Sequence, residues 1–331
     1  MAKEYYSVIN HWNNIIEDAE ITIETSQILN LLIEAENNIK IHSRMKDRVR
    51  FFYRGESEDY GETRLTPSVF RGNNEKQGYF DALTHFPQEF SGLSNLSKLA
   101  KMQHYTYPTR LLDLTTNPLV ALWFACSDYS RYGSTNELKN EDGYFYIIAA
   151  HEQHILTYDS DRALLLACLA KLDDENEKPV LTQLLYTLAK RNGGIEHLCL
   201  TNELIATCRS DADLQQGILV FEKFIGEANR ERSAFANYKT MATDLLSTFI
   251  VRPQIENERL KKQAGVFAIF GIQATLYDSS RWFKINRFRI PQANKKSILI
   301  ELDKLGINEA TLFGDIESRA NYNRFRKREK Y

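Results

Sequence analysis

Lys101–Cys126 reads KMQHYTYPTRLLDLTTNPLVALWFAC and connects two segments that have the apolar spacing of helices. Over Leu93–Tyr105, leucine, alanine and methionine recur every three or four residues, and a proline then ends the predicted helix. Leu119–Tyr129 is strongly apolar and predicts a second helix, for which Asn117 or Thr116 is the expected N-cap. The fold is therefore expected to hold a polar connection between two buried helices.

Polar side chains are more concentrated in this connection than a plain loop would need. Buried polar groups must be paired, and loops held between rigid elements are where binding sites are commonly built. A purely structural explanation stays open, in which Arg110 and Asp113 form a buried ion pair and the Thr and Asn side chains cap the next helix. The candidate residues are Gln103, His104, Tyr105, Thr109, Arg110, Asp113, Thr115, Thr116 and Asn117.

A second candidate lies earlier in the chain, where the aromatic-rich run Val49–Gly55 predicts a strand. The strand ends in Tyr53, Arg54 and Gly55. Arginine offers a planar, permanently charged fork, and glycine lets the backbone approach closely, so the group suits a phosphate or a carboxylate. The alternative is a surface arginine at the end of a hairpin.

Predicted strands lie on both sides of a helical middle, which favours an α+β fold with a single mixed sheet formed by early and late strands, flanked by helices, with a helical insertion. The expected divisions are an N-terminal helical segment (1–48), a core in two parts (49–158 and 247–331) and the insertion (159–246). Two independent domains are the alternative. Besides those above, the predicted strands are Tyr144–Ala150, Thr248–Arg252, Val266–Phe270 and Lys284–Ile290, and the predicted helices are Glu20–Ile41, Gln77–Phe90, Asp159–Leu172, Pro179–Arg191, Pro291–Leu305 and Asp315–Lys330.

Composition excludes several classes of protein. The 331 residues carry 42 Lys+Arg and 44 Asp+Glu, a net charge of 42 − 44 = −2, so nucleic-acid binding through a general basic surface is not indicated. No apolar run approaches the roughly 20 residues of a membrane span, and the N-terminus does not resemble a secretory signal, so we expect a cytoplasmic protein without membrane contact. The four cysteines show no CxxC spacing, which predicts free thiols.

Common catalytic motifs do not occur. The sequence has no P-loop, no GxGxxG after a predicted strand and no GxSxG. The two histidines of His151–His154 are three residues apart rather than four, so the segment is not expected to bind a metal.

Two motifs together closely resemble the FRG domain family: FYRGES at Phe52–Ser57 and QHYTYPTRLLDLTTNPLVALWFAC at Gln103–Cys126. QAGVFAIF at Gln263–Phe270 and GINEATLFGDIE at Gly306–Glu317 fit as well. Tyr53 stands where the family has Phe, and Gly314 replaces a Pro. The resemblance implies a bacterial or phage protein, and a role in phage defence is expected from it.

The order of the motifs also resembles ADP-ribosyltransferases of the Arg-Ser-Glu type, which implies NAD as the cosubstrate and no metal. By that resemblance Arg54 holds the NAD phosphates or ribose, the Thr115–Thr116 pair supports the nicotinamide side, and Gln263 approaches the acceptor. His104 is expected to act as acid or base or to contact a ribose. The implied catalytic residues are Arg54, His104, Asp113 and Gln263, and the ligand-binding ones are Tyr53, Gly55, Gln103, Thr109, Arg110, Thr115, Thr116 and Asn117.

A glutamine cannot supply the negative charge that a glutamate brings to such a transfer. Asp113, Glu56 or Glu258 would have to take that role. The predicted function is therefore that of an NAD-using transferase acting on a macromolecular acceptor. Association of the chain into a homo-oligomer is one predicted state. The alternative is a non-catalytic module that senses a nucleotide or phosphate and is recognised by a partner protein.

Overall fold

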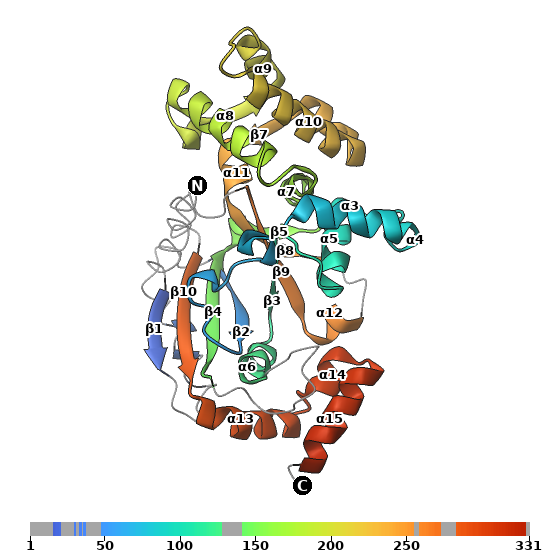
Figure 1. Ribbon diagram of the computed structural model, residues 1–331. Helices are drawn as coiled ribbons and strands as arrows, with labels where there is room; N and C mark the ends of the chain where they lie inside the picture. The colour runs from blue at the N-terminus through green and yellow to red at the C-terminus, as the bar shows by residue number, and fades with distance from the viewer. Residues whose placement is uncertain are drawn as a thin grey trace.

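The described residues of the chain form a mixed eight-stranded sheet with helices packed on it (Figure 1). The computed structural model describes residues 16–20, 30, 33–34, 36–37, 48–127, 141–254, 258–272 and 283–328. The strand order across the sheet is β1-β10-β4-β2-β3-β9-β8-β5. The strands are β1 Ile16–Glu20, β2 Val49–Glu56, β3 Leu111–Thr115, β4 Gly143–His151, β5 Ile155–Thr157, β8 Thr248–Arg252, β9 Gly265–Phe270 and β10 Phe283–Ile290.

The pairing is antiparallel in the middle of the sheet and parallel at its two ends. β1 runs parallel to β10 and β5 parallel to β8, while the strands between them alternate in direction. Strands from the first half of the chain thus pair with strands from its end. The predicted mixed sheet of early and late strands, flanked by helices, is confirmed.

One face of the sheet is covered by α6 (Pro118–Cys126), which packs on β2 and β4. Asn117 caps this helix by accepting a hydrogen bond from the Leu119 amide, as the sequence predicted. α13 (Gln292–Lys304) packs against α6, and their leucine, valine and alanine side chains share a core with Phe145 and Phe288. The chain ends in α14 (Glu309–Phe313) and α15 (Ile316–Arg328).

Helices that precede β3 pack on the other side of the fold with helices of the middle segment. The first group is α3 (Glu75–His85), α4 (Pro87–Phe90) and α5 (Asn95–His104). The middle segment contributes α7 (Asp161–Cys168), α8 (Glu177–Arg191), α9 (Asn202–Cys208), α10 (Gln215–Glu231) and α11 (Ala242–Leu246), with a small sheet of β6 (Cys199–Thr201) and β7 (Lys239–Met241). Figure 1 shows α8, α9 and α10 at the end of the molecule away from α13.

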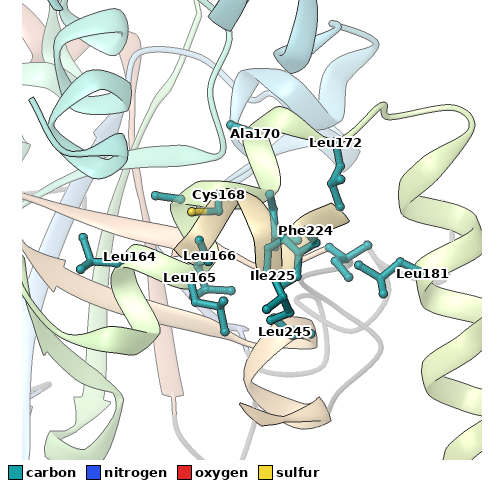
Figure 2. Close-up of a cluster of buried hydrophobic side chains, with 14 of the residues drawn as sticks. Leu164, Leu165, Leu166, Cys168, Ala170, Leu172, Leu181, Phe224, Ile225 and Leu245 are labelled. Atoms are coloured by element: carbon teal, nitrogen blue, oxygen red, sulfur yellow. The ribbon is translucent and has the colours of Figure 1, made fainter. Parts of the chain in front are cut away.

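The middle segment has a core of its own side chains, which continues into the rest of the fold. Figure 2 shows Leu165 and Leu166 of α7 close to Phe224 of α10 and Leu245 of α11, with Leu164 on the other side of α7. The same buried cluster includes side chains of α3, α5 and β9. The apolar surface of the middle segment is therefore buried partly against itself and partly against the sheet and its helices.

Two features differ from the sequence-based expectation. The segment treated as a polar connection contains a strand, β3, because Leu111–Thr115 pairs with β9 along its whole length. The predicted helix Glu20–Ile41 begins at a residue that ends β1, and most of that helix lies outside the described residues. The cysteines are free as predicted; Cys126 and Cys168 are buried, and burial raises the pKa of each thiol to about 12.

Candidate functional site

β2 and β3 are neighbours in the sheet, but only one pair of residues, Tyr53 and Thr115, joins them. By contrast, β2 pairs with β4 over Val49–Glu56 and β3 pairs with β9 over Leu111–Thr115. We call the region around that pair, Tyr53–Glu56 with Asp113–Thr115, the β2–β3 junction. It is where the two FRG-like motifs of the sequence meet.

Arg54 connects the two strands through its side chain. One terminal guanidinium nitrogen donates to the main-chain carbonyl of Asp113 at 2.7 Å, and Nε donates to Glu56 Oε1 at 3.0 Å. Burial opposes the charge of Arg54, but the carboxylates of Glu56 and Asp113 outweigh it and raise the pKa of the guanidinium. The Arg54 side chain, 21% exposed, is therefore a fixed cation that solvent and ligands can reach.

Glu56 is the buried acid of the junction. Its Oε1 also accepts a hydrogen bond from the Leu65 amide at 3.2 Å, whereas its buried Oε2 has no hydrogen-bond partner among the described residues. The Tyr146 hydroxyl is buried nearby, where burial and the charge of Glu56 raise its pKa. Contact with Glu56 also contributes to the raised pKa of Tyr146, so the two groups form a buried polar pair at the base of the junction.

Further charges surround Arg54. Burial and the charge of Arg54 lower the pKa of Arg71. Burial raises the pKa of the Tyr60 hydroxyl, which also interacts electrostatically with Glu56 and Arg54. Arg64 is near enough to influence Tyr146. The junction therefore has two arginines, Arg54 and Arg71, near one buried carboxylate.

Tyr53 and Gly55 face away from Arg54, because successive side chains of a strand point to opposite faces. The Tyr53 hydroxyl donates to Glu36, and burial together with that contact raises the pKa of the hydroxyl. A Cβ on Gly55 would lie 1.9 Å from the carbonyl oxygen of Ala121. The absence of a side chain at residue 55 therefore lets α6 approach the sheet.

Asp113 is tied to α5 through a short chain of hydrogen bonds. Gln103 Nε2 donates to Asp113 Oδ2 at 3.0 Å, and the Thr109 hydroxyl donates to Gln103 Oε1. The Thr109 amide in turn donates to Ser68 Oγ at 3.2 Å. Three of the predicted site residues thus form one connected group.

Thr115 and Thr116 are anchored to the turn before β9. The Thr115 hydroxyl donates to the Gln263 carbonyl at 2.7 Å, and the Thr116 amide donates to the Ala264 carbonyl at 3.0 Å. Gln263 Nε2 donates to the Leu312 carbonyl at 3.3 Å, so its side chain is directed toward α14. The main chain of Gln263 meets the junction, while its amide group lies toward the C-terminal helices.

Arg110 does not pair with Asp113. Its main-chain amide donates to Glu75 Oε1 at 2.7 Å and its guanidinium donates to Glu75 Oε2, with Arg110 only 1% exposed. The guanidinium also donates to the Phe270 carbonyl at 3.1 Å, and Lys178 of α8 donates to Glu75 at 3.2 Å. The expected buried ion pair exists, but its acid is Glu75, which the sequence analysis did not single out.

His104 lies at the end of α5, with Nδ1 3.4 Å from a terminal nitrogen of Arg259. Arg259 belongs to α12 (Glu258–Lys262), and its guanidinium also stacks on Phe313. His104 lines a pocket between α5, α12 and the end of β8. Glu258, one of the carboxylates weighed from the sequence, is exposed on α12.

Backbone strain gathers around the junction. Among the described residues, three that are not glycine have positive φ: Leu65 at 52°, Thr106 at 66° and Ala264 at 46°. Leu65 donates to Glu56, Ala264 accepts from Thr116, and Thr106 follows the end of α5. Such conformations cost about 1–3 kcal/mol each and cluster at functional sites.

Sequence reasoning missed Glu75, Arg71 and Tyr60. Glu75 is the first residue of α3 and is close to Arg110 only through the fold. His154 is buried and stacks on Phe249 with ring centres 4.6 Å apart. Among the described residues, no group of three or more His, Cys, Asp or Glu side chains could hold a metal ion. In the same part of the chain, no helix has the length and apolar character to cross a membrane.

Comparison with protein-family models matches residues 49–133 to the FRG domain. That range includes β2, β3, α5 and α6, and thus both strands of the junction. Comparisons with curated proteins and with solved structures found no match. The chain is therefore identified as one that contains an FRG domain.

Proposed function

We propose that the chain is an ADP-ribosyltransferase-like enzyme that binds NAD at the β2–β3 junction and transfers its ADP-ribose to a macromolecular acceptor. The observation that carries this proposal is the placement of Arg54 between two strands joined by a single pair of residues. Arg54 is held on both sides, carries a raised pKa and lies near Arg71. Guanidinium groups in such an array suit a diphosphate, which accepts paired hydrogen bonds.

The transfer itself requires negative charge near the reacting carbon. The bond between nicotinamide nitrogen and ribose C1′ breaks, its electron pair leaves with nicotinamide, and an acceptor nucleophile bonds C1′ and loses its proton. Ribose becomes cationic during this exchange, so a placed carboxylate lowers the barrier. Glu56 supports this role better than Gln263, because it is a carboxyl group paired with Arg54, whereas the Gln263 amide is directed toward α14.

The test is incubation of the full chain with NAD, followed by chromatography for nicotinamide and mass spectrometry for ADP-ribose on the chain or on an added lysate. Glu56→Gln should lower nicotinamide release by about 100-fold or more, within the range of losses seen for removal of one electrostatic group at a reacting centre. Asp161→Asn, at an exposed acid of α7 paired with Arg232, is the control and should leave release unchanged. Absence of both nicotinamide release and added mass would refute the transferase.

The second candidate is a non-catalytic module that binds a nucleotide or phosphate at the same junction. It is favoured by the contacts of Arg54, which are already filled by Glu56 and the Asp113 carbonyl. A ligand phosphate would then compete for Arg54 and change the link between β2 and β3. Calorimetric binding of NAD or ADP-ribose without turnover would select this candidate. A role in phage defence and a homo-oligomeric state stay predictions from the sequence.

A further inference from the structure

A pocket of about 290 Å³ lies beside α5, outside the β2–β3 junction. It is formed by one side of α5, the residue that follows β5, the chain after β8 and one side chain of α12. Its lining residues are Leu93, Leu96, Ser97, Ala100, Lys101, His104, Tyr105, Tyr158, Pro253, Gln254 and Leu260.

The lining has an apolar base and two exposed aromatic rings. Leu96 is buried, and Leu93, Ala100 and Leu260 pack against the same core. Tyr105 is 55% exposed and Tyr158 is 43% exposed, although both are large rings that would normally be covered. Pockets that enclose drug-sized ligands span roughly 300–1,000 Å³, so this one has room for a single ring system rather than a dinucleotide.

Tyr105 is held by its backbone rather than by a covering side chain. Its amide donates to the carbonyls of Lys101 and Met102, at 3.3 and 3.0 Å, and the next residue, Thr106, turns the chain with φ 66°. The Tyr105 ring meets His104 edge to face, with ring centres 4.9 Å apart. A ring that is already fixed loses little conformational entropy when a planar ligand stacks on it.

Positive charge accompanies the pocket. Arg252 and Lys261 are exposed and adjoin the lining residues Pro253 and Leu260 in the chain. A terminal nitrogen of Arg259 lies within hydrogen-bond distance of His104 Nδ1, and Lys101 Nζ forms an ion pair with Glu89 Oε2 at 2.5 Å. The lining itself combines two exposed tyrosine rings with Lys101, and aromatic rings are the platform on which a base stacks.

We propose that this pocket binds a nucleobase, with Tyr105 and Tyr158 stacking on the ring. The base belongs either to a free nucleotide or to an unpaired position in a nucleic-acid strand. The inference goes beyond the transferase proposal and does not depend on it.

The test uses the full chain with three probes: AMP, a ten-residue oligoadenylate and ribose 5-phosphate. AMP and the oligoadenylate should bind, and Tyr105→Ala and Tyr158→Ala should each weaken binding by about tenfold, as loss of one stacked base contact does. Tighter binding of the oligoadenylate, with an affinity that falls as salt increases, would identify a strand as the source of the base. Equal affinities, with little dependence on salt, would identify a free nucleotide.

Controls separate this pocket from the junction and from general effects. Phe86→Ala removes an aromatic side chain that is 53% exposed outside the pocket and should leave binding unchanged. Ser97→Phe, which fills the pocket and leaves the junction untouched, should abolish the binding that Tyr105→Ala and Tyr158→Ala weaken. Equal binding of ribose 5-phosphate would overturn the proposal, and so would preference for N-acetyl-tyrosinamide, which would indicate an aromatic peptide.

Discussion

The Arg54 guanidinium donates to the Asp113 carbonyl at 2.7 Å, and this side-chain bond lies directly beside the single pair that joins β2 to β3. In most of the sheet, neighbouring strands are linked by main-chain hydrogen bonds alone. At this point part of that linkage is made by a charged side chain. Any ligand that recruits Arg54 therefore also alters the contact between the two parts of the sheet.

Arg54→Lys is expected to reduce NAD or ADP-ribose binding by about tenfold or more, because lysine keeps the charge but loses the planar fork. Arg54→Ala is a poorer test than Arg54→Lys, since it would leave the buried Glu56 carboxylate without its cation. Binding is measured by calorimetry. Arg191→Lys, at an arginine that is 48% exposed and paired with Asp211, is the matched control. Undiminished binding in Arg54→Lys would remove Arg54 from the ligand site.

Glu75→Gln is expected to destabilise the protein by roughly 3–5 kcal/mol, because the buried Arg110 would keep its positive charge without an acid and Lys178 would be left with Asp174 alone. Burial alone would raise the pKa of Glu75, but Arg110 and Lys178 outweigh it and hold the pKa below the ordinary value of 4.5. The stabilisation from ionised Glu75 is thus present above about pH 4.5 and is lost as the pH falls through the folded pKa.

Urea unfolding of both proteins between pH 3 and 7 measures this contribution. The difference in unfolding free energy between the natural chain and Glu75→Gln should be largest near neutral pH and shrink toward pH 3. Glu152→Gln, at an exposed surface pair with Arg50, is the control and should change stability by less than about 1 kcal/mol. A difference that did not vary with pH would show that Glu75 contributes by shape rather than charge.

His154 is expected to make stability depend on pH between about 4 and 6.5, a higher range than that of Glu75. Burial lowers its pKa to about 4, from an ordinary value of 6.5, despite the hydrogen bond to the Thr248 carbonyl. The unfolded chain therefore takes up this proton first, so stability is complete above pH 6.5 and falls as the pH drops toward 4. Integrated over that range the loss amounts to about 3 kcal/mol. Urea unfolding at pH 7.5 and pH 5 should show a smaller loss for His154→Gln than for the natural chain.

Gly55→Ala is expected to disrupt folding, because the added Cβ would lie 1.9 Å from the Ala121 carbonyl oxygen and 2.4 Å from the Ala125 nitrogen. Backbone atoms of a helix cannot move aside cheaply, so a cost of several kcal/mol is expected, above the ~1–3 kcal/mol of ordinary overpacking. Gly226→Ala in α10 has open space at the same position and should raise stability by about 0.5–1 kcal/mol. Thermal unfolding compares the two, and equal stabilities would show that α6 can shift.

Much of the sheet could be predicted because aromatic and β-branched runs such as Tyr144–Ala150 are too short and too apolar to favour helix. β3 could not be predicted in the same way, because the five residues LLDLT between two apolar helices do not distinguish a strand from a connecting segment. It becomes a strand by pairing with β9, more than 150 residues later in the chain. That contact is a property of the tertiary fold and has no local signal.

In the candidate site, too, contacts that arise only from the tertiary fold could not be predicted from the sequence. The sequence brought Arg54 and Asp113 together through two motifs, and the structure places them in contact. Gly55 was assigned to a ligand, but alternation along β2 turns it toward α6. The partner of Arg110 could not be chosen from the sequence, because Glu75 becomes its neighbour only when α3 packs beside β3.

Lys178 stands in the helical middle segment, yet its ammonium group helps to neutralise Glu75, which lies 103 positions earlier in the chain. Charge balance inside the FRG-containing part of the protein is therefore shared with a distant segment. A deletion of 159–246 would remove Lys178, a cation that the remaining core needs. A change at residue 75 would in turn restrict which side chains are tolerated at residue 178 of α8. The two segments are coupled in what mutations each can accept, whatever ligand the protein binds.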